Sequence, residues 1–153
     1  MATGVRTSRA GTIVLVIDPD PATRLVLEWA AELEGLRPVV VSSASDAYGI
    51  FAEESNQIIL VVLDMARGAE EGVAARRLQL DAPRVAAIPA VVLSDRPLTD
   101  AERATLQPAI TVLKPLQVEE AQEIMRGGRS ATWRDGVFVR GLSGGALASF
   151  SIS

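Results

Sequence analysis

The stretch Ile58–Asp64 reads IILVVLD, an unbroken apolar run that ends directly at a carboxylate. The run is too short for a typical helix, and it lacks the alternation of polar and apolar residues that marks a half-buried strand. We therefore predict a β-strand that is buried on both faces. Strands of this kind are typical of parallel sheets that are covered by helices on each side.

Four further apolar runs of the same kind lie on either side of this stretch, at residues 12–17, 38–41, 90–93 and 110–113. Segments with helical spacing alternate with them, and we predict helices at about 21–33, 45–55, 70–80, 99–106 and 117–126. Asp20-Pro21 and Thr99 are expected to begin two of these helices, Ser43 or Ser45 to cap another, and Gly35 to end the first.

Strands and helices in this alternation make a sequence of β–α units. The predicted fold class is therefore α/β, a doubly wound five-stranded parallel sheet with helices on both faces. In such a fold the ligand site lies beyond the carboxyl ends of the strands.

The composition of the 153 residues restricts the chemistry, because the chain has no cysteine and no histidine. Disulfides, a thiol nucleophile, a Ser–His relay and a soft metal site are therefore excluded. The net charge of −4 disfavours nucleic-acid binding. No apolar run approaches the roughly 20 residues that a bilayer helix needs. We expect a cytoplasmic protein with no membrane insertion and no nucleic-acid partner.

Polar side chains follow four of the predicted strands and should meet at one edge of the sheet. They are Asp18 and Asp20, Asp64, Ser94 and Asp95, and Lys114, which is the only lysine of the chain. A carboxylate such as Asp64 can act as a nucleophile toward a phosphoryl group. A hydroxyl and an ammonium group facing it could bind the phosphoryl oxygens, and neighbouring acids could hold a hard cation.

Residues from about 12 to 127 resemble the receiver domain of bacterial response regulators, the CheY-like (βα)5 form of the flavodoxin-like fold. The matching pieces are Val14-Leu-Val-Ile-Asp18 with Arg24, Val61-Val-Leu-Asp-Met65 with Gly72, Val91-Val-Leu-Ser94, and Leu113-Lys-Pro-Leu116. Their order and spacing, on the predicted fold, carry the resemblance.

The resemblance implies that Asp64 accepts a phosphoryl group from a phosphohistidine on a histidine kinase or phosphotransfer protein. It implies a Mg²⁺ site formed by Asp18, Asp64 and the backbone carbonyl of Ala66, to which Asp20 is a further candidate ligand. Ser94 would be the hydroxyl that moves toward the phosphoryl group, and Lys114 the lysine that pairs with it. The Lys114–Pro115 peptide bond is expected to be cis, as is usual in this family.

The chain departs from the receiver pattern at four functional positions. Pro19 stands where receivers carry a second acid, Arg67-Gly68 replace the usual Met-Pro pair, Asp95 replaces a small residue, and Thr111 replaces the aromatic switch residue. Two hypotheses follow from the resemblance. The chain is either a stand-alone receiver that is phosphorylated on Asp64 and acts by binding a downstream protein, or a degenerate receiver that binds partners independently of phosphorylation.

A third hypothesis is a small hydrolase or nucleotide enzyme on the same fold. It is disfavoured because the chain lacks a phosphate loop and a nucleophile elbow, so we do not expect an enzyme.

Several residues have simpler structural interpretations. Asp20 is expected to cap the helix that begins at Pro21. Glu53-Glu54 and Glu119-Glu120 are expected on solvated helix faces, and Arg76-Arg77 needs no ligand. In the first helix an apolar face is expected, formed by Leu25, Leu27, Trp29, Ala30 and Leu33, and Trp29 is expected to pack in the core or at an interface rather than against a cofactor.

The predicted organisation is an N-terminal extension at 1–11, a receiver domain at 12–127 and a C-terminal extension at 128–153. Asp135-Gly136 could turn a small hairpin in the extension. The alternatives are a flexible tail and an arm, formed by 133–139 and 150–152, that docks on a partner or on a second copy in a homodimer.

Overall fold

The computed structural model describes residues 11–107, 109–129, 133–134, 137–138 and 150–152. Its main sheet has six strands in the order β2-β1-β3-β4-β5-β8. The strands of this sheet are β1 (Ile13–Ile17), β2 (Arg37–Val41), β3 (Ile58–Asp64), β4 (Ala90–Ser94), β5 (Ile110–Leu113) and β8 (Phe150–Ile152).

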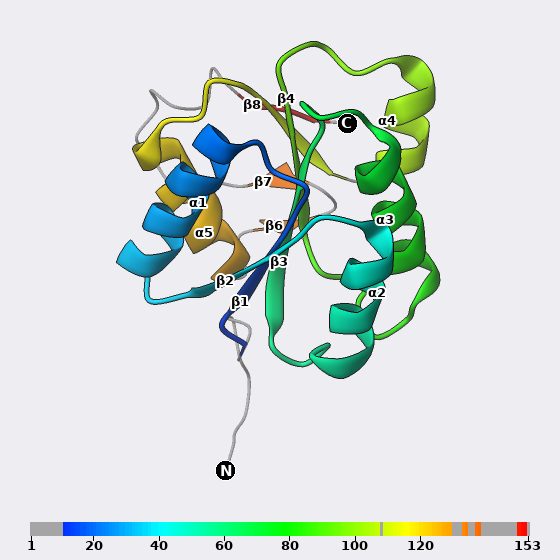
Figure 1. Cartoon of the computed structure of the whole chain (residues 1–153), viewed down its shortest axis with the longest axis horizontal. Helices are drawn as coiled ribbons and strands as arrows, with labels where there is room; N and C mark the ends of the chain where they lie inside the picture. Colours follow the sequence, from blue (N-terminus) through cyan, green and yellow to red (C-terminus); the bar gives the residue numbers. More distant parts are fainter. Residues whose placement is uncertain (1–10, 108, 130–132, 135–136, 139–149, 153) are drawn as a thin grey trace.

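Five helices cover this sheet: α1 (Pro21–Leu33), α2 (Ala44–Glu53), α3 (Glu70–Asp81), α4 (Asp100–Leu106) and α5 (Val118–Arg129). Figure 1 shows α1 and α5 on one face of the sheet and α2, α3 and α4 on the other. Each face has its own apolar core. Leu27 of α1 and Ile124 of α5 belong to one core, and Phe51 of α2 and Ala75 of α3 belong to the other.

The strands β1 to β5 pair in parallel, which confirms the doubly wound arrangement. The strands β1, β3 and β4 are buried along their whole lengths, as the apolar runs predicted. Because β3 ends at Asp64, the sheet carries this carboxylate to its carboxyl edge while the rest of the strand stays in the core.

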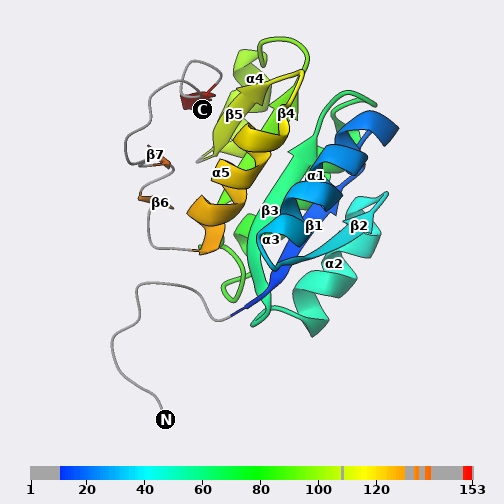
Figure 2. The same cartoon turned by 90° about the vertical axis from the view of Figure 1, so that its left-hand side faces the viewer.

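The sixth strand of the sheet was not predicted. β8 pairs antiparallel with β5 over Ile110–Val112, so it lies at the edge of the sheet beside the last parallel strand (Figure 2). The strands β6 (Trp133–Arg134) and β7 (Val137–Phe138) also pair antiparallel, with Trp133 opposite Phe138. The predicted turn at Asp135-Gly136 lies between them, outside the described residues.

The helices begin where the sequence predicted. The Asp20 carboxylate accepts the N–H of Thr23 at 2.8 Å and so caps α1, and Ser43 caps α2 through the N–H of Asp46. Thr99 and Glu102 form a capping box at the start of α4. Gly35 has a φ of 72° just after α1, a left-handed conformation that glycine adopts without strain and that ends the helix.

The apolar face predicted for α1 is divided between the core and the solvent. Leu27 and Ala30 are buried, but Leu25, Trp29 and Leu33 are 68%, 59% and 54% exposed. The reason is geometric: the three exposed residues follow one another at intervals of four and lie on the side of the helix opposite Leu27. The helix therefore has an apolar side in the core and a second apolar side in solvent.

The solvated face predicted for Glu119-Glu120 was wrong for Glu120. Its carboxylate turns back and accepts the N–H of Gln117 at 3.0 Å at the start of α5, and the residue is buried. Arg76 in α3 is also buried, while its neighbour Arg77 is exposed. Within the described residues, no helix is long and apolar enough to cross a membrane.

Candidate functional site

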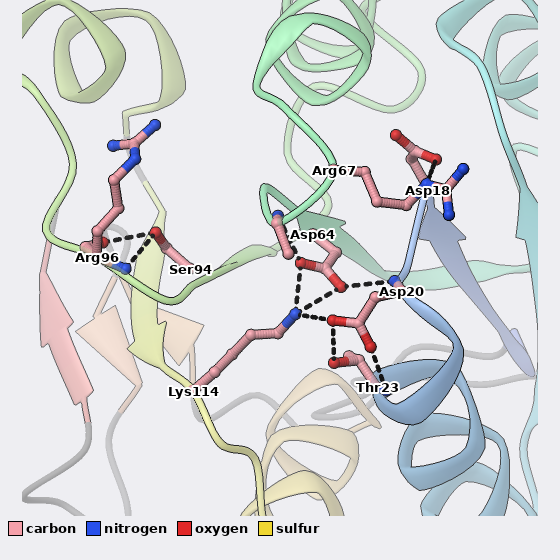
Figure 3. Close-up of polar contacts among 9 residues, drawn as sticks. Asp18, Asp20, Thr23, Asp64, Arg67, Ser94, Arg96 and Lys114 are labelled. Atoms are coloured by element: carbon pink, nitrogen blue, oxygen red, sulfur yellow. Dashed lines mark hydrogen bonds and ion pairs between the residues drawn. The ribbon is translucent and has the colours of Figure 1, made fainter.

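Three charged side chains from distant parts of the chain meet at the carboxyl edge of the sheet (Figure 3). Asp64 ends β3, Asp20 precedes the first residue of α1, and Lys114 follows β5. Lys114 precedes Pro115, and the peptide bond between them is cis, as predicted. Asp20 and Lys114, which are 44 and 50 positions from Asp64 in the sequence, thus both contact the Asp64 carboxylate.

Both oxygens of the Asp64 carboxylate have hydrogen-bond donors. The Lys114 Nζ lies 2.9 Å from Oδ1 and 2.9 Å from Oδ2. The N–H of Ala66 donates to Oδ1 at 3.0 Å, and the N–H of Asp20 donates to Oδ2 at 3.0 Å. The side chain of Asp64 is fully buried, so these donors compensate its charge where water does not reach it.

Lys114 also forms an ion pair with the Asp20 carboxylate, so one ammonium group bridges two acids. Burial lowers the pKa of Lys114, but the hydrogen bonds to Asp20 and Asp64 outweigh that effect and raise it, so the ammonium stays charged at neutral pH. Burial raises the pKa of Asp20, but hydrogen bonds from Lys114 and Thr23 outweigh it and lower the pKa from 3.8 to about 2. The cluster therefore holds an ionised Asp20 and a charged Lys114 beside Asp64.

Asp18, the expected metal ligand after β1, is not part of this cluster. Its carboxylate pairs with the Arg67 Nε at 3.1 Å, and Figure 3 shows the side chain directed away from Asp64. Its backbone has a φ of 53°, in the left-handed region that aspartate tolerates better than most residues. The next residue is Pro19, which has no side-chain oxygen and so cannot replace Asp18 as a metal ligand.

Ser94 ends β4 but turns away from Asp64 (Figure 3). Its hydroxyl donates to the carbonyl of Arg96 and accepts the N–H of the same residue at 3.2 Å. Arg96 in turn forms two hydrogen bonds with Glu102, at 2.9 and 2.8 Å, and Glu102 belongs to the capping box of α4. Ser94 is thus linked to the start of α4.

The residues as arranged do not fit the Mg²⁺ site that the resemblance implied. A hard cation needs several oxygen ligands around one point, but Asp18 is engaged by Arg67 and Lys114 lies between Asp20 and Asp64. The described residues contain no group of three or more acids placed to hold a metal ion. Ala66 contributes its N–H to Asp64.

Two cavities open at the carboxyl edge of the sheet. One of about 360 Å³ borders the ion pair itself and is lined by Asp20, Ala22, Thr23, Val26, Asp95, Lys114, Pro115 and Leu116. A larger one of about 590 Å³ lies next to Asp18 and Arg67, between the starts of α1 and α2. Asp95 thus lines the smaller cavity and adds negative charge there.

Arg67 and Arg96 contact residues of the candidate site, and neither contact was predicted from the sequence. Both follow a strand end, which is the signal that could have marked them. Arginine at a strand end has no fixed partner in the sequence, however, and its long side chain can reach acids on several neighbouring loops.

The low pKa of Asp20 leads to a prediction for Asp20→Asn. A carboxylate whose pKa is lowered on folding stabilises the fold above its unfolded pKa, and this contribution is lost as the pH falls through the folded value. The stability difference between wild type and Asp20→Asn should be constant above about pH 5 and shrink as the pH falls from there toward 2. Urea unfolding of both proteins at several pH values measures this stability difference. A difference that stays constant down to pH 2 would contradict the lowered pKa of Asp20.

Comparison with known proteins gives the fold. No family model matches the chain, and no curated protein matches it. Solved structures do match. The chemotaxis response regulator CheY4 of Vibrio cholerae is 11% identical with a TM-score of 0.65, over 78% of this chain and 99% of that one.

Two receiver domains are similar at higher identity. The receiver domain of the sensor histidine kinase PA1611 from Pseudomonas aeruginosa, described with magnesium in its active site cleft, is 20% identical with a TM-score of 0.62, over 76% of this chain and 96% of that one. A response regulator receiver protein from Pseudomonas putida is 25% identical with a TM-score of 0.60, over 76% and 97%. The chain therefore has the CheY-like fold of response-regulator receiver domains.

Proposed function

We propose that the chain is a signalling receiver in two-component (phosphorelay) signal transduction and that Asp64 is its phosphoryl acceptor. The observation that carries the proposal is the contact of the Lys114 Nζ with both oxygens of Asp64, at the carboxyl edge of a receiver fold. A buried carboxylate with a fixed ammonium beside it is placed to gain negative charge, because that ammonium can neutralise the added oxygens.

The proposed reaction transfers a phosphoryl group to one Oδ of Asp64. That oxygen attacks the phosphorus of a phosphohistidine, a P–O bond forms, the P–N bond breaks, and the released imidazole nitrogen takes a proton. The 153 residues contain no histidine, so the phosphohistidine lies outside them, on a histidine kinase or a phosphotransfer protein. The cavity of about 360 Å³ is lined by Asp20 and Lys114 but not by the fully buried Asp64, so the donor reaches Asp64 through this cavity once the Asp20–Lys114 ion pair opens.

Lys114 and Asp20 then respond to the added charge. Phosphoryl oxygens compete with the Asp20 carboxylate for the ammonium, because Lys114 now holds both acids. Asp20 caps α1 through Oδ1 and binds Lys114 through Oδ2, so its release from the ammonium leaves the cap of the helix in place. No step of this scheme uses a metal, since the arranged residues do not fit one. Mg²⁺ binding would first require Asp18 to leave Arg67.

The readout that we propose runs from Ser94 to α4. If the Ser94 hydroxyl turns to the phosphoryl group, it gives up its two hydrogen bonds with the backbone of Arg96. Arg96 holds Glu102, which closes the capping box of α4. Rotation of one hydroxyl thus changes the start of a short helix at the protein surface, where a downstream protein can detect it.

A second candidate function is favoured by the ion pairs of the site. Arg67 neutralises Asp18, and Lys114 is bound to Asp20 as well as to Asp64. Asp95 lines the adjoining cavity and would repel a phosphoryl group. A site whose charges are compensated internally suits a degenerate receiver that binds its partner without phosphorylation.

Beryllofluoride, which imitates a phosphoryl group on a carboxylate, separates the two functions. The receiver predicts saturable amide NMR shifts that spread from Asp64 to Ser94 and Lys114, and their absence in Asp64→Asn. The titration is run with and without Mg²⁺, so that any dependence on the cation is seen directly. No saturable shift under either condition would contradict the receiver and favour the phosphorylation-independent module.

A further inference from the structure

The exposed side of α1 carries a stripe of large apolar side chains that the site does not use. Leu25, Trp29 and Leu33 are each more than half exposed and follow at intervals of four residues. They account for three of the five exposed large hydrophobic residues among those the structure describes. The other two are Tyr48 on α2 and Leu113 on β5.

This stripe points away from the rest of the protein. The residues of α1 that face the sheet are Thr23, Leu27, Ala30 and Ala31, all of them buried. At 100° of rotation per residue, Trp29 lies on the opposite side of the helix from Leu27. The views in Figures 1 and 2 agree that α1 lies on the outside of the sheet beside α5, so its outer side is open.

The stripe is complementary to a second copy of itself. When two α1 helices pack antiparallel about a twofold axis near Trp29, Leu25 of each copy faces Leu33 of the other, because the two residues are equally far from Trp29. The two tryptophans then meet at the centre of the contact. Buried aromatic residues at the centre of an interface contribute most of its binding energy.

The charges beside the stripe are complementary in the same arrangement. Arg24, Glu28 and Glu32 lie along one flank of the stripe, again at intervals of four. The twofold axis places this flank against the same flank of the other copy. Since Arg24 lies five residues before Trp29 and Glu32 three after it, each Arg24 comes within about 3 Å, along the helix axis, of Glu32 of the other copy. Glu28 of one copy approaches Glu28 of the other. The charge of each Glu28 is balanced by Arg24 of the same helix, whose Nε lies 3.1 Å from its carboxylate.

We propose that α1 is the interface of a symmetric homodimer, in which the Leu25–Trp29–Leu33 stripes of two copies pack antiparallel and Arg24 pairs with Glu32 across the twofold axis. A parallel twofold arrangement would instead place the Arg24–Glu32 flanks of the two copies on opposite sides of the contact, so that Arg24 could not reach Glu32 of the other copy. The charges therefore select the antiparallel one. The proposal does not depend on phosphorylation of Asp64.

Sedimentation velocity of the full chain over a wide concentration range tests the dimer. The wild type is expected to dimerise, and Trp29→Glu and Leu25→Glu are each expected to raise the dissociation constant at least about tenfold, since each puts a charge into the apolar contact. Tyr48→Glu is the matched control, because Tyr48 is 55% exposed on α2 and lies outside the stripe. All three positions are exposed, so the variants keep the fold, which amide NMR spectra verify.

The charge pair tests the antiparallel arrangement. Arg24→Glu alone and Glu32→Arg alone should each weaken the dimer, and the double variant Arg24→Glu/Glu32→Arg should restore it, because the opposite charges face each other again. A wild type that stays monomeric at millimolar concentration would overturn the proposal. So would a dimer that Trp29→Glu leaves intact, that Tyr48→Glu weakens equally, or that the double variant fails to restore.

Discussion

Lys114→Met is expected to lower the free energy of unfolding by about 2–3 kcal/mol at neutral pH. Methionine keeps most of the volume of the side chain but removes the ammonium that both oxygens of Asp64 contact at 2.9 Å. Asp64 is fully buried, so it is left with only the two backbone N–H donors. We place the effect below the 3–5 kcal/mol typical of a broken buried pair, because Asp20 is partly exposed to water.

The double variant Lys114→Met/Asp64→Asn is the matched control. If the loss arises from an uncompensated Asp64 charge, asparagine should recover most of it, because a neutral amide costs much less to bury than a carboxylate. Urea unfolding of the wild type, the two single variants and the double variant closes the thermodynamic cycle. A loss below about 0.5 kcal/mol for Lys114→Met is the size expected of an ordinary surface substitution. It would contradict the claim that Lys114 compensates the buried charge of Asp64.

Arg76→Ala is expected to cost about 3–4 kcal/mol of stability. Arg76 is only 1% exposed, its Nε donates to the carbonyl of Leu106 at 2.9 Å, and its Nη1 donates to Gln79 Oε1 at 2.7 Å. Gln79 in turn donates to the carbonyls of Val85 and Ile88. The substitution leaves a cavity and removes donors from buried acceptors, and it detaches the end of α4 from α3.

Arg77→Ala provides the comparison, since Arg77 is the next residue of α3 and is exposed. It loses the same charge and the same side chain without opening a cavity, so its stability should stay within about 0.5 kcal/mol of the wild type. Thermal and urea unfolding of the two variants measure the difference. Equal losses for Arg76→Ala and Arg77→Ala would show that the buried network contributes nothing.

The fold could be predicted because its central strands β1, β3 and β4 are buried on both faces. A strand such as Ile58–Asp64 has only apolar residues until it leaves the core, so both its type and its end are visible in the sequence. The same property located the site: Asp64 and Lys114 stand where apolar strands end, and parallel strands bring those ends together.

The contacts within the site could not be predicted in the same way. The sequence places Asp18 and Asp20 equally well at the edge of the sheet, but a left-handed φ at Asp18 sends its side chain to Arg67. Asp20 both caps α1 and binds Lys114, whereas the sequence analysis treated capping and a role in the site as alternatives. The partners of a side chain depend on the local backbone conformation, which the residue type alone does not determine.

Hydrophobicity and charge did not always indicate which side chains are buried. Trp29 is exposed although its neighbours at helical spacing are apolar, because α1 has apolar residues on two sides. Arg76 is buried although it is charged, because carbonyl and amide oxygens satisfy its guanidinium. The strand β8 has only three residues and pairs with β5, which is far away in the sequence, so no local pattern marks it.

The intact mass of the protein after incubation with acetyl phosphate, measured for the wild type and for Asp64→Asn, tests directly whether Asp64 accepts a phosphoryl group. The wild type is expected to gain the mass of one phosphoryl group, and peptide mapping is expected to place it on Asp64. Asp64→Asn should gain nothing, because an amide cannot form the acyl phosphate. A wild type that gains no mass, with or without Mg²⁺, or a variant that is modified to the same extent, would contradict the assignment of Asp64 as phosphoryl acceptor.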